Sequence, residues 1–158
     1  MKRFLVDSSI LIHLDRIGEV RLLRDLLGQI HVTAEVAEEV RAGPSPVDLN
    51  GPDFAGWVVL LPGRKSVAQL GLGPGEASLL LAARAGDRLV LDDAQARALA
   101  EVRGLEYVGL LGVILAGATS RRIKADRALA ILDALVATEF RLAPELYAKA
   151  RRTLESIE

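Results

Sequence analysis

The chain opens with Lys2-Arg3-Phe4-Leu5-Val6-Asp7-Ser8-Ser9, in which three apolar residues run directly into an aspartate and two hydroxyls. From Ile10 onward the apolar residues follow a helical spacing. A short buried strand that ends in a carboxylate as a helix begins places this carboxylate at the C-terminal edge of a parallel sheet, where open α/β sheets bind ligands. The same order returns in Arg88-Leu89-Val90-Leu91-Asp92-Asp93. Two strands that each end in acid predict one site.

The composition limits the class of protein. A chain of 158 residues with 51% hydrophobic residues fits one domain, residues 1–158, with a substantial core. The absence of cysteine excludes disulfides and thiolate chemistry, so a metal would be held by oxygen or histidine. The net charge of −1 excludes a uniformly basic nucleic-acid binder, but a local basic patch could still steer a nucleic acid.

No stretch of the sequence predicts a membrane span or a signal peptide. The longest nearly apolar run, residues 107–118, is shorter than the ~20 residues that cross a bilayer. Near the N-terminus, Asp7 interrupts the apolar run too early for a signal peptide. We therefore expect a soluble, cytoplasmic protein with no membrane partner.

Strands and helices alternate along the chain, which indicates an α/β fold with a mainly parallel sheet of about four or five strands. After the first strand, strands are expected at 30–32, 57–61, 88–91 and 107–109. The strand at 57–61 is expected near the periphery of the sheet. The pattern from Ile10 to Leu27, interrupted at Gly18, predicts two helices or one helix with a break. Further helices are expected at 33–41 with Thr33 as N-cap, 74–85, 94–102, 111–122, 125–138 and 144–156. Residues 44–56, rich in Pro, Gly and Asp, predict a loop.

Four carboxylates on different elements are candidates for the site, and each has a simpler structural role. Asp7 could cap the first helix, although Ser8 or Ser9 could do so instead. Glu39 flanks the Val36/Val40 stripe of its helix, a position that solvation explains less well than it explains Glu38. Glu76 lies in a first helical turn, where an acid complements the helix dipole.

The fourth candidate comes from the pair Asp92 and Asp93. One of the two can cap the following helix, but adjacent carboxylates repel each other and a cation would relieve that repulsion. Spacing alone leaves open which one faces the site, and we select Asp93 because it is nearer the helix start. If the sheet is parallel, all four acids can meet at one edge, where oxygen ligands suit Mg²⁺ or Mn²⁺.

These residues resemble the PIN-domain ribonucleases, specifically the compact prokaryotic branch with the VapC-like toxins. The similar segments cover nearly the whole chain: 6–9, 36–40, 73–77, 90–93, 109–114 and 143–147. The resemblance implies a three-layer α/β/α sandwich. It also implies a metal-binding catalytic quartet of Asp7, Glu39, Glu76 and Asp93, with Ser9 supporting the first acid and Asp92 as an assisting neighbour or a further ligand.

The resemblance further implies a metal-dependent endoribonuclease that acts as the toxin of a toxin–antitoxin pair and forms a homodimer. Arginines would hold the RNA phosphates, and Arg97, Arg121 and Arg122 are candidates, although a solvated position on a helix is the favoured explanation for each. The sequence departs from the family at Leu110, where a polar residue is usual. This departure puts in question a hydroxyl contact from that position.

Other functions and motifs fit the sequence less well than a PIN-like nuclease. A PIN-like module that mainly binds a protein partner would not need all four acids. Aspartate-based phosphatase or receiver domains require a different placement of the acids, since position 9 is serine and the acid pair is at 92–93. The glycines at 71–75 lack the spacing of a dinucleotide loop. His13 and His31 have no partners for a triad or a zinc site and are interpreted as structural.

Overall fold

A computed structural model describes residues 2–63 and 71–157 of the chain. In this part of the chain a five-stranded, all-parallel sheet has the order β3-β2-β1-β4-β5. The strands are β1 (Phe4–Val6), β2 (Ile30–Thr33), β3 (Val58–Leu61), β4 (Arg88–Val90) and β5 (Glu106–Val108). The parallel α/β prediction is confirmed, and β3 lies at an edge of the sheet as expected.

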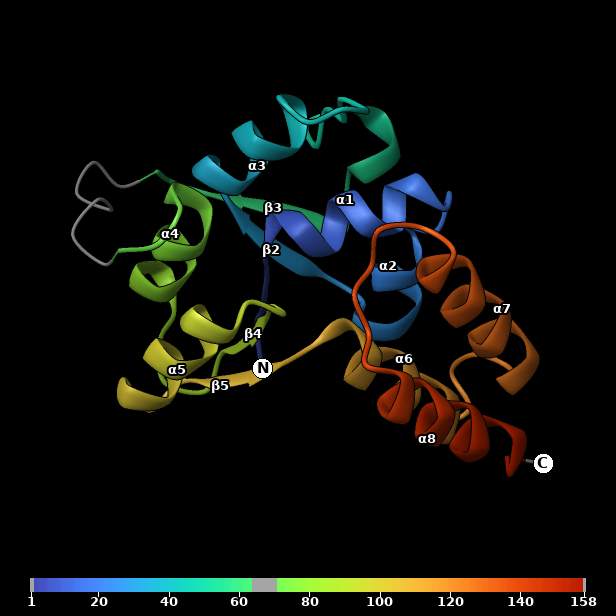
Figure 1. Cartoon of the computed structure of the whole chain (residues 1–158). Helices are drawn as coiled ribbons and strands as arrows, with labels where there is room; N and C mark the ends of the chain where they lie inside the picture. Colours follow the sequence, from blue (N-terminus) through green and yellow to red (C-terminus); the bar gives the residue numbers. More distant parts are fainter. Residues whose placement is uncertain (1, 64–70, 158) are drawn as a thin grey trace.

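Helices cover both faces of the sheet and complete a three-layer sandwich (Figure 1). Figure 1 shows α4 and α5 on one side of the sheet, α1, α2 and α6 on the other, and α7 and α8 packed outside α6. The helices are α1 (Ser8–Arg16), α2 (Leu22–Leu27), α3 (Ala34–Arg41), α4 (Pro74–Ala82), α5 (Ala94–Val102), α6 (Leu110–Thr119), α7 (Ala125–Val136) and α8 (Pro144–Glu155).

The strand order creates a topological switch point between β1 and β4. From β1 the chain moves outward to β2 and β3, and then returns to the other side of β1 to form β4 and β5. The two strands are in register, with Phe4 opposite Arg88 and Val6 opposite Val90. Where the connections from two adjacent parallel strands run in opposite directions, a crevice forms at the carboxyl ends of these strands. Asp7 directly follows the last paired residue of β1, and Asp92 lies two residues beyond Val90, so both lie at the crevice.

Most helices begin where the sequence predicts, but several end earlier. Gly18, with φ +70°, separates α1 from α2, so the N-terminal helical pattern forms two helices. The α4 helix stops at Ala82 rather than residue 85, because the backbone N–H of Arg84 donates to Asp87 Oδ2 (2.8 Å). The α6 helix stops at Thr119 rather than residue 122, because Arg121 adopts a left-handed conformation with φ +61°.

The segment 44–56 is less irregular than predicted, since a short 3₁₀ helix, η1 (Pro52–Phe54), lies within it. Its Phe54 is buried and packs against Trp57, with ring centroids 5.5 Å apart. Thr33 caps α3 as expected, accepting a hydrogen bond from Val36 N (3.2 Å). Among the described residues, no helix combines the length and the apolar character needed to cross a membrane.

Candidate metal centre

Asp7 follows β1 and occupies the N-cap position of α1, but its side chain makes no capping hydrogen bond. The residue is 1% exposed, and Ser9 Oγ donates to its Oδ2 (3.0 Å). Its Oδ1 is buried and has no hydrogen-bond partner in the described structure. Burial raises the pKa of Asp7, the charge of Glu39 adds to this, and the hydrogen bond from Ser9 opposes it. An unpartnered buried carboxylate oxygen is costly unless a ligand satisfies it.

Glu39 links three helices at this edge of the sheet. One of its oxygens, Oε2, accepts from Ser8 Oγ of α1 (2.5 Å), and Oε1 accepts from the backbone N–H of Gly75 in α4 (2.8 Å). A Cβ atom at position 75 would collide with the Glu39 carboxylate, so only glycine allows this approach. Ser8 and Gly75 were not among the predicted site residues, because neither has a side-chain pattern that reveals a tertiary partner.

Glu76 lies in the first turn of α4, beside the other acids. Its pKa is raised from 4.5 to about 7 by burial first, and then by the charges of Asp7, Asp93 and Glu39. A helix N-terminus ordinarily favours the charged form of an acid, so here burial, together with the three neighbouring carboxylates, outweighs the dipole. The structure therefore brings the four predicted acids close enough to act on one another.

Asp92 and Asp93 face different partners. Asp93 caps α5, accepting from Ala96 N (2.8 Å), and its charge acts on Glu76. Asp92 instead accepts from Arg97 Nη2 at Oδ1 (2.9 Å) and, more weakly, from Leu110 N at Oδ2 (3.5 Å). Its pKa is raised because burial outweighs the favourable charge of Arg97.

The turn that leads into α6 also contributes to this edge. Gly109 lies against the side chains of Asp92 and Arg97, and a Cβ at this position would collide with both. The backbone N–H of Leu110, rather than a side-chain hydroxyl, makes the contact to Asp92. The apolar residue at position 110 is buried in the core, so the polar function of this turn comes from the main chain.

The donor set fits a hard divalent cation. All four side chains offer carboxylate oxygens, and one of these oxygens is buried without a partner in the described structure. After burial, the charges of the other three acids contribute to the raised pKa of Glu76. In residues 2–63 and 71–157, however, no three acid or histidine side chains already converge as ligands around one point. The carboxylates of Glu39 and Asp93 are turned instead toward Gly75 and the start of α5.

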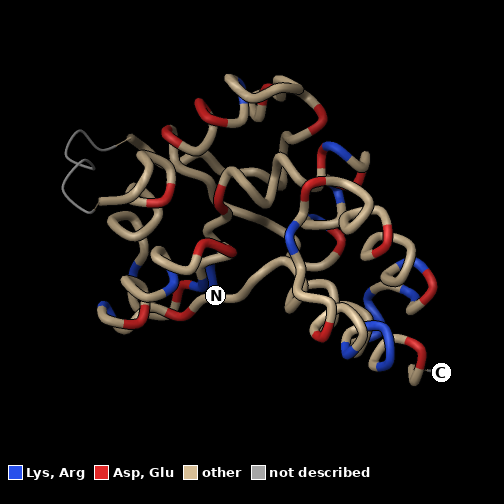
Figure 2. The backbone as a smooth tube through the Cα atoms, viewed as in Figure 1, with Lys and Arg blue, Asp and Glu red and all other residues tan. Residues whose placement is uncertain are grey.

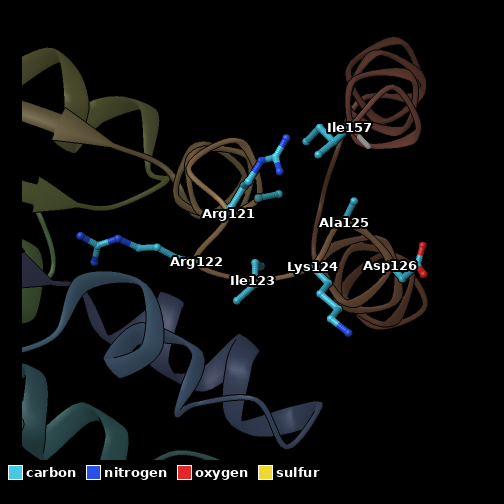
Figure 3. A pocket seen from close by; sticks show the side chains of 8 residues that line it. Arg121, Arg122, Ile123, Lys124, Ala125, Asp126 and Ile157 are labelled. Carbon is cyan, nitrogen blue, oxygen red and sulfur yellow. The ribbon is translucent and has the colours of Figure 1, made fainter.

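The candidate phosphate-binding arginines lie at two different places. Arg97 is at the acidic edge, where its Nε donates to Leu91 O (3.0 Å) and its guanidinium lies 5.4 Å from the centre of the Tyr107 ring. Arg121 and Arg122 follow the far end of α6 and are not brought together with the acids. They line a cavity of about 390 Å³ with Lys124, where Figure 3 shows the two arginines pointing in different directions. Arg122 donates to Leu26 O (2.8 Å).

Neither histidine makes a hydrogen bond to a carboxylate in the described structure. His13, on α1, packs edge-on against Phe140 with ring centroids 5.2 Å apart. His31 lies within β2. Burial lowers the pKa of both, and the Nδ1 atom of each is buried without a hydrogen-bond partner in the described structure. This agrees with a structural rather than a ligand role.

In Figure 2, acidic positions lie near the carboxyl ends of the central strands, whereas the outer helix α8 carries three basic residues, Lys149, Arg151 and Arg152. A parallel sheet with an acidic crevice at its switch point defines an α/β protein with a candidate cation-dependent active site. A family model for the PIN domain matches residues 3–156, so the chain belongs to the PIN-domain family, whose fold is of the nuclease type. No curated protein and no solved structure is significantly similar to the chain.

Proposed function

We propose that the chain is an endoribonuclease that hydrolyses RNA phosphodiester bonds at the acidic crevice with Mg²⁺ or Mn²⁺. Asp7, Glu39, Glu76 and Asp93 would hold the ion, and Asp92 is a further candidate ligand. The observations that carry the proposal are that the charges of Asp7, Glu39 and Asp93 all act on Glu76, and that Asp7 has a buried oxygen without a hydrogen-bond partner in the described structure. When bound, such an ion activates water and neutralises charge on a phosphoryl oxygen.

The surrounding residues prepare the acids for this role. Ser9 orients Asp7 by donating to Oδ2, which leaves Oδ1 directed away from that bond. Glu76, with a pKa of about 7, exchanges its proton near neutral pH and becomes a full anion when positive charge enters the crevice. Arg97 is held at the edge by Leu91 O and Asp92 and offers positive charge beside a chain of phosphates.

Cleavage of a mixed pool of structured and single-stranded RNA tests this function. The wild type is expected to cut the RNA with Mg²⁺ or Mn²⁺ but not with EDTA. Asp93→Asn, which can still cap α5, should lose the activity while keeping the circular-dichroism spectrum of the wild type. Arg152→Gln, an exposed position on α8, is the matched surface control. Cleavage by Asp93→Asn at the wild-type rate would remove the carboxylate site from the mechanism.

We also propose that the protein acts as the toxin of a toxin–antitoxin pair and forms a homodimer. The support is the resemblance to the VapC-like branch of the PIN-domain family. A short DNA-binding protein encoded in the adjacent gene would support the toxin role. Light scattering of the isolated protein tests the dimer, and a monomer at micromolar concentration would contradict it.

A further inference from the structure

A second cavity, of about 380 Å³, lies beside the acidic crevice. It is bounded by the β4–α5 turn, the start of α6 and the connection between α7 and α8 (residues 137–143). We call it the Phe140 pocket. The lining residues used in the proposal below are Asp92, Arg97, Leu111, Phe140, Arg141 and Leu146. Asp92 belongs to this pocket and directly precedes Asp93, so the pocket opens next to the proposed metal centre.

One wall of the Phe140 pocket is polar and fixed. Arg97 is held by three contacts: its Nε with Leu91 O (3.0 Å), its Nη2 with Asp92 Oδ1 (2.9 Å), and its guanidinium over the Tyr107 ring. The side chains of Arg97 and Asp92 remain about one third exposed, 33% and 34% respectively. This wall therefore presents an ordered donor and acceptor to a ligand without carrying a large net charge.

Other lining residues of the Phe140 pocket are apolar, and the segment that carries Phe140 contacts α1. Leu111 and Leu146 belong to this apolar wall, and Leu146 is unusually exposed for a large apolar residue, at 46%. The connection that carries Phe140 is attached to α1 by the edge-on contact with His13 and by the ion pair of Arg16 with Glu139 (3.3 Å). An exposed apolar wall on a fixed segment, next to a polar wall, is typical of a small-ligand site.

Arg141 is an exposed cation at this pocket. Within residues 2–63 and 71–157, its guanidinium has no ion pair and no side-chain hydrogen bond, whereas the nearby Arg16, Arg97 and Arg151 each have a carboxylate partner. An arginine that no local acid neutralises, placed beside an apolar wall and a phosphodiester-cleaving crevice, is complementary to a nucleotide phosphate.

We propose that the Phe140 pocket binds one nucleotide of a single-stranded RNA substrate, next to the bond that is cut. The base lies against Leu111, Phe140 and Leu146, with the Arg97–Asp92 pair at its polar edge, and Arg141 contacts the adjoining phosphate. This inference rests on the proposed function and adds the place where the substrate is bound. A cavity of about 380 Å³ lies at the lower end of ligand-site volumes and suits one nucleotide rather than a duplex.

The test uses the Asp93→Asn protein in Mg²⁺, so that a fluorescein-labelled single-stranded RNA stays intact while its binding is followed by anisotropy at several salt concentrations. Adding Arg141→Gln is expected to weaken binding about tenfold. It should also reduce the slope of log K against log salt by about 0.7, the value for one phosphate contact on a single strand. Adding Leu146→Ala is expected to weaken binding about threefold without changing the slope, because it removes only apolar contact.

Two matched variants control for general surface effects. Arg152→Gln removes an exposed charge elsewhere on α8, and Val102→Ala shortens an apolar side chain that is 83% exposed on α5. Both should bind RNA within twofold of the parent protein. In the otherwise wild-type protein, Arg141→Gln should raise KM while leaving kcat within about twofold, since Arg141 acts on binding rather than on the reacting atoms.

The outcomes separate this inference from the proposed function. RNA binding by Arg141→Gln and Leu146→Ala equal to that of their controls, together with metal-dependent cleavage by the wild type, would overturn the pocket and leave the nuclease standing. Unchanged RNA binding, with weaker binding of a protein partner by Leu146→Ala, would assign the pocket to a protein segment instead. No cleavage by the wild type and no RNA binding by the Asp93→Asn protein would overturn both.

Discussion

Asp7 and Asp87 are both buried aspartates, and they lie at opposite ends of the same pair of strands. Asp87 directly precedes β4 and is 6% exposed, while Asp7 directly follows β1 and is 1% exposed. Arg3 reaches Asp87 through two bonds, Nε to Oδ1 (3.0 Å) and Nη2 to Oδ2 (2.6 Å), and Arg84 N donates a third (2.8 Å). Asp7 has a hydroxyl partner at one oxygen and none at the other.

The pKa values of the two groups move in opposite directions. The hydrogen bonds from Arg3 are the largest cause that lowers the pKa of Asp87, whereas burial raises the pKa of Asp7. A lowered pKa means that the folded state favours the charged carboxylate, and a raised pKa means that the folded state resists it. The amino end of the sheet thus uses its acid for stability, and the carboxyl end keeps its acids in an unfavourable state that a ligand can relieve.

The largest expected effect is that substitution of Asp87 lowers stability, whereas substitution of Asp7 lowers RNA cleavage. Asp87→Asn should lower the free energy of unfolding by about 2–4 kcal/mol, because it leaves Arg3 without its charged partner. Asp7→Asn should leave that free energy unchanged or higher, while reducing RNA cleavage more than about 100-fold. Urea denaturation and cleavage assays measure the two properties. A large loss of stability in Asp7→Asn would show that the comparison between the two ends is wrong.

A smaller effect is expected on the pH dependence of stability. Since the pKa of Glu76 rises from 4.5 to about 7 on folding, the folded state binds more protons between these values. Stability should therefore fall as pH increases from 5 to 8 in EDTA, by about 1 kcal/mol because solvent screens this partly exposed group.

Mg²⁺ should restore much of this loss at pH 8, since it binds the folded state. Glu76→Gln is the control: its melting temperature should change less over the same pH range and respond less to Mg²⁺. Thermal melts at matched ionic strength make the measurement. Equal pH profiles for the wild type and Glu76→Gln would argue against a repulsive acid cluster.

The smallest effect concerns the hydroxyl that supports Asp7. Ser9→Ala removes the hydrogen bond to Oδ2 and should raise the pKa of Asp7 further. Cleavage near neutral pH should fall about tenfold and recover in part at higher pH, as expected when an outer partner of a ligand is lost. Ser120→Ala, whose hydroxyl donates to Gly117 O at the far end of α6, is the matched control. A pH profile identical to that of the wild type would separate Ser9 from the site.

The succession of strands and helices along the chain could be predicted from the sequence because it depends on local patterns. The same patterns indicated the edge of the sheet at which the acids lie. An apolar run that ends in acid identifies β1 and β4, and the hydroxyl of Thr33 marks the start of α3. The parallel sheet then places Asp7 and Asp93 at one edge.

Other features depend on tertiary approach and leave no periodic signal. Spacing could not show that Asp92 pairs with Arg97 while Asp93 caps α5. Nor could it show that Glu39 is held by Ser8 and Gly75. The return of the α7–α8 connection to His13 joins segments more than a hundred residues apart, and it brings Arg141 to the Phe140 pocket, whereas Arg121 and Arg122 line a different cavity.

The switch point between β1 and β4 is set by the path of the chain and not by the acids that line it. An isosteric change such as Asp93→Asn removes a charge but leaves the strand register, the start of α6 and the Phe140 pocket in place. On the proposed function, a chain with this architecture is therefore one substitution away from a protein that binds RNA without cutting it. Such a variant would serve as a substrate trap, and sequencing the retained RNA would identify what the active form selects.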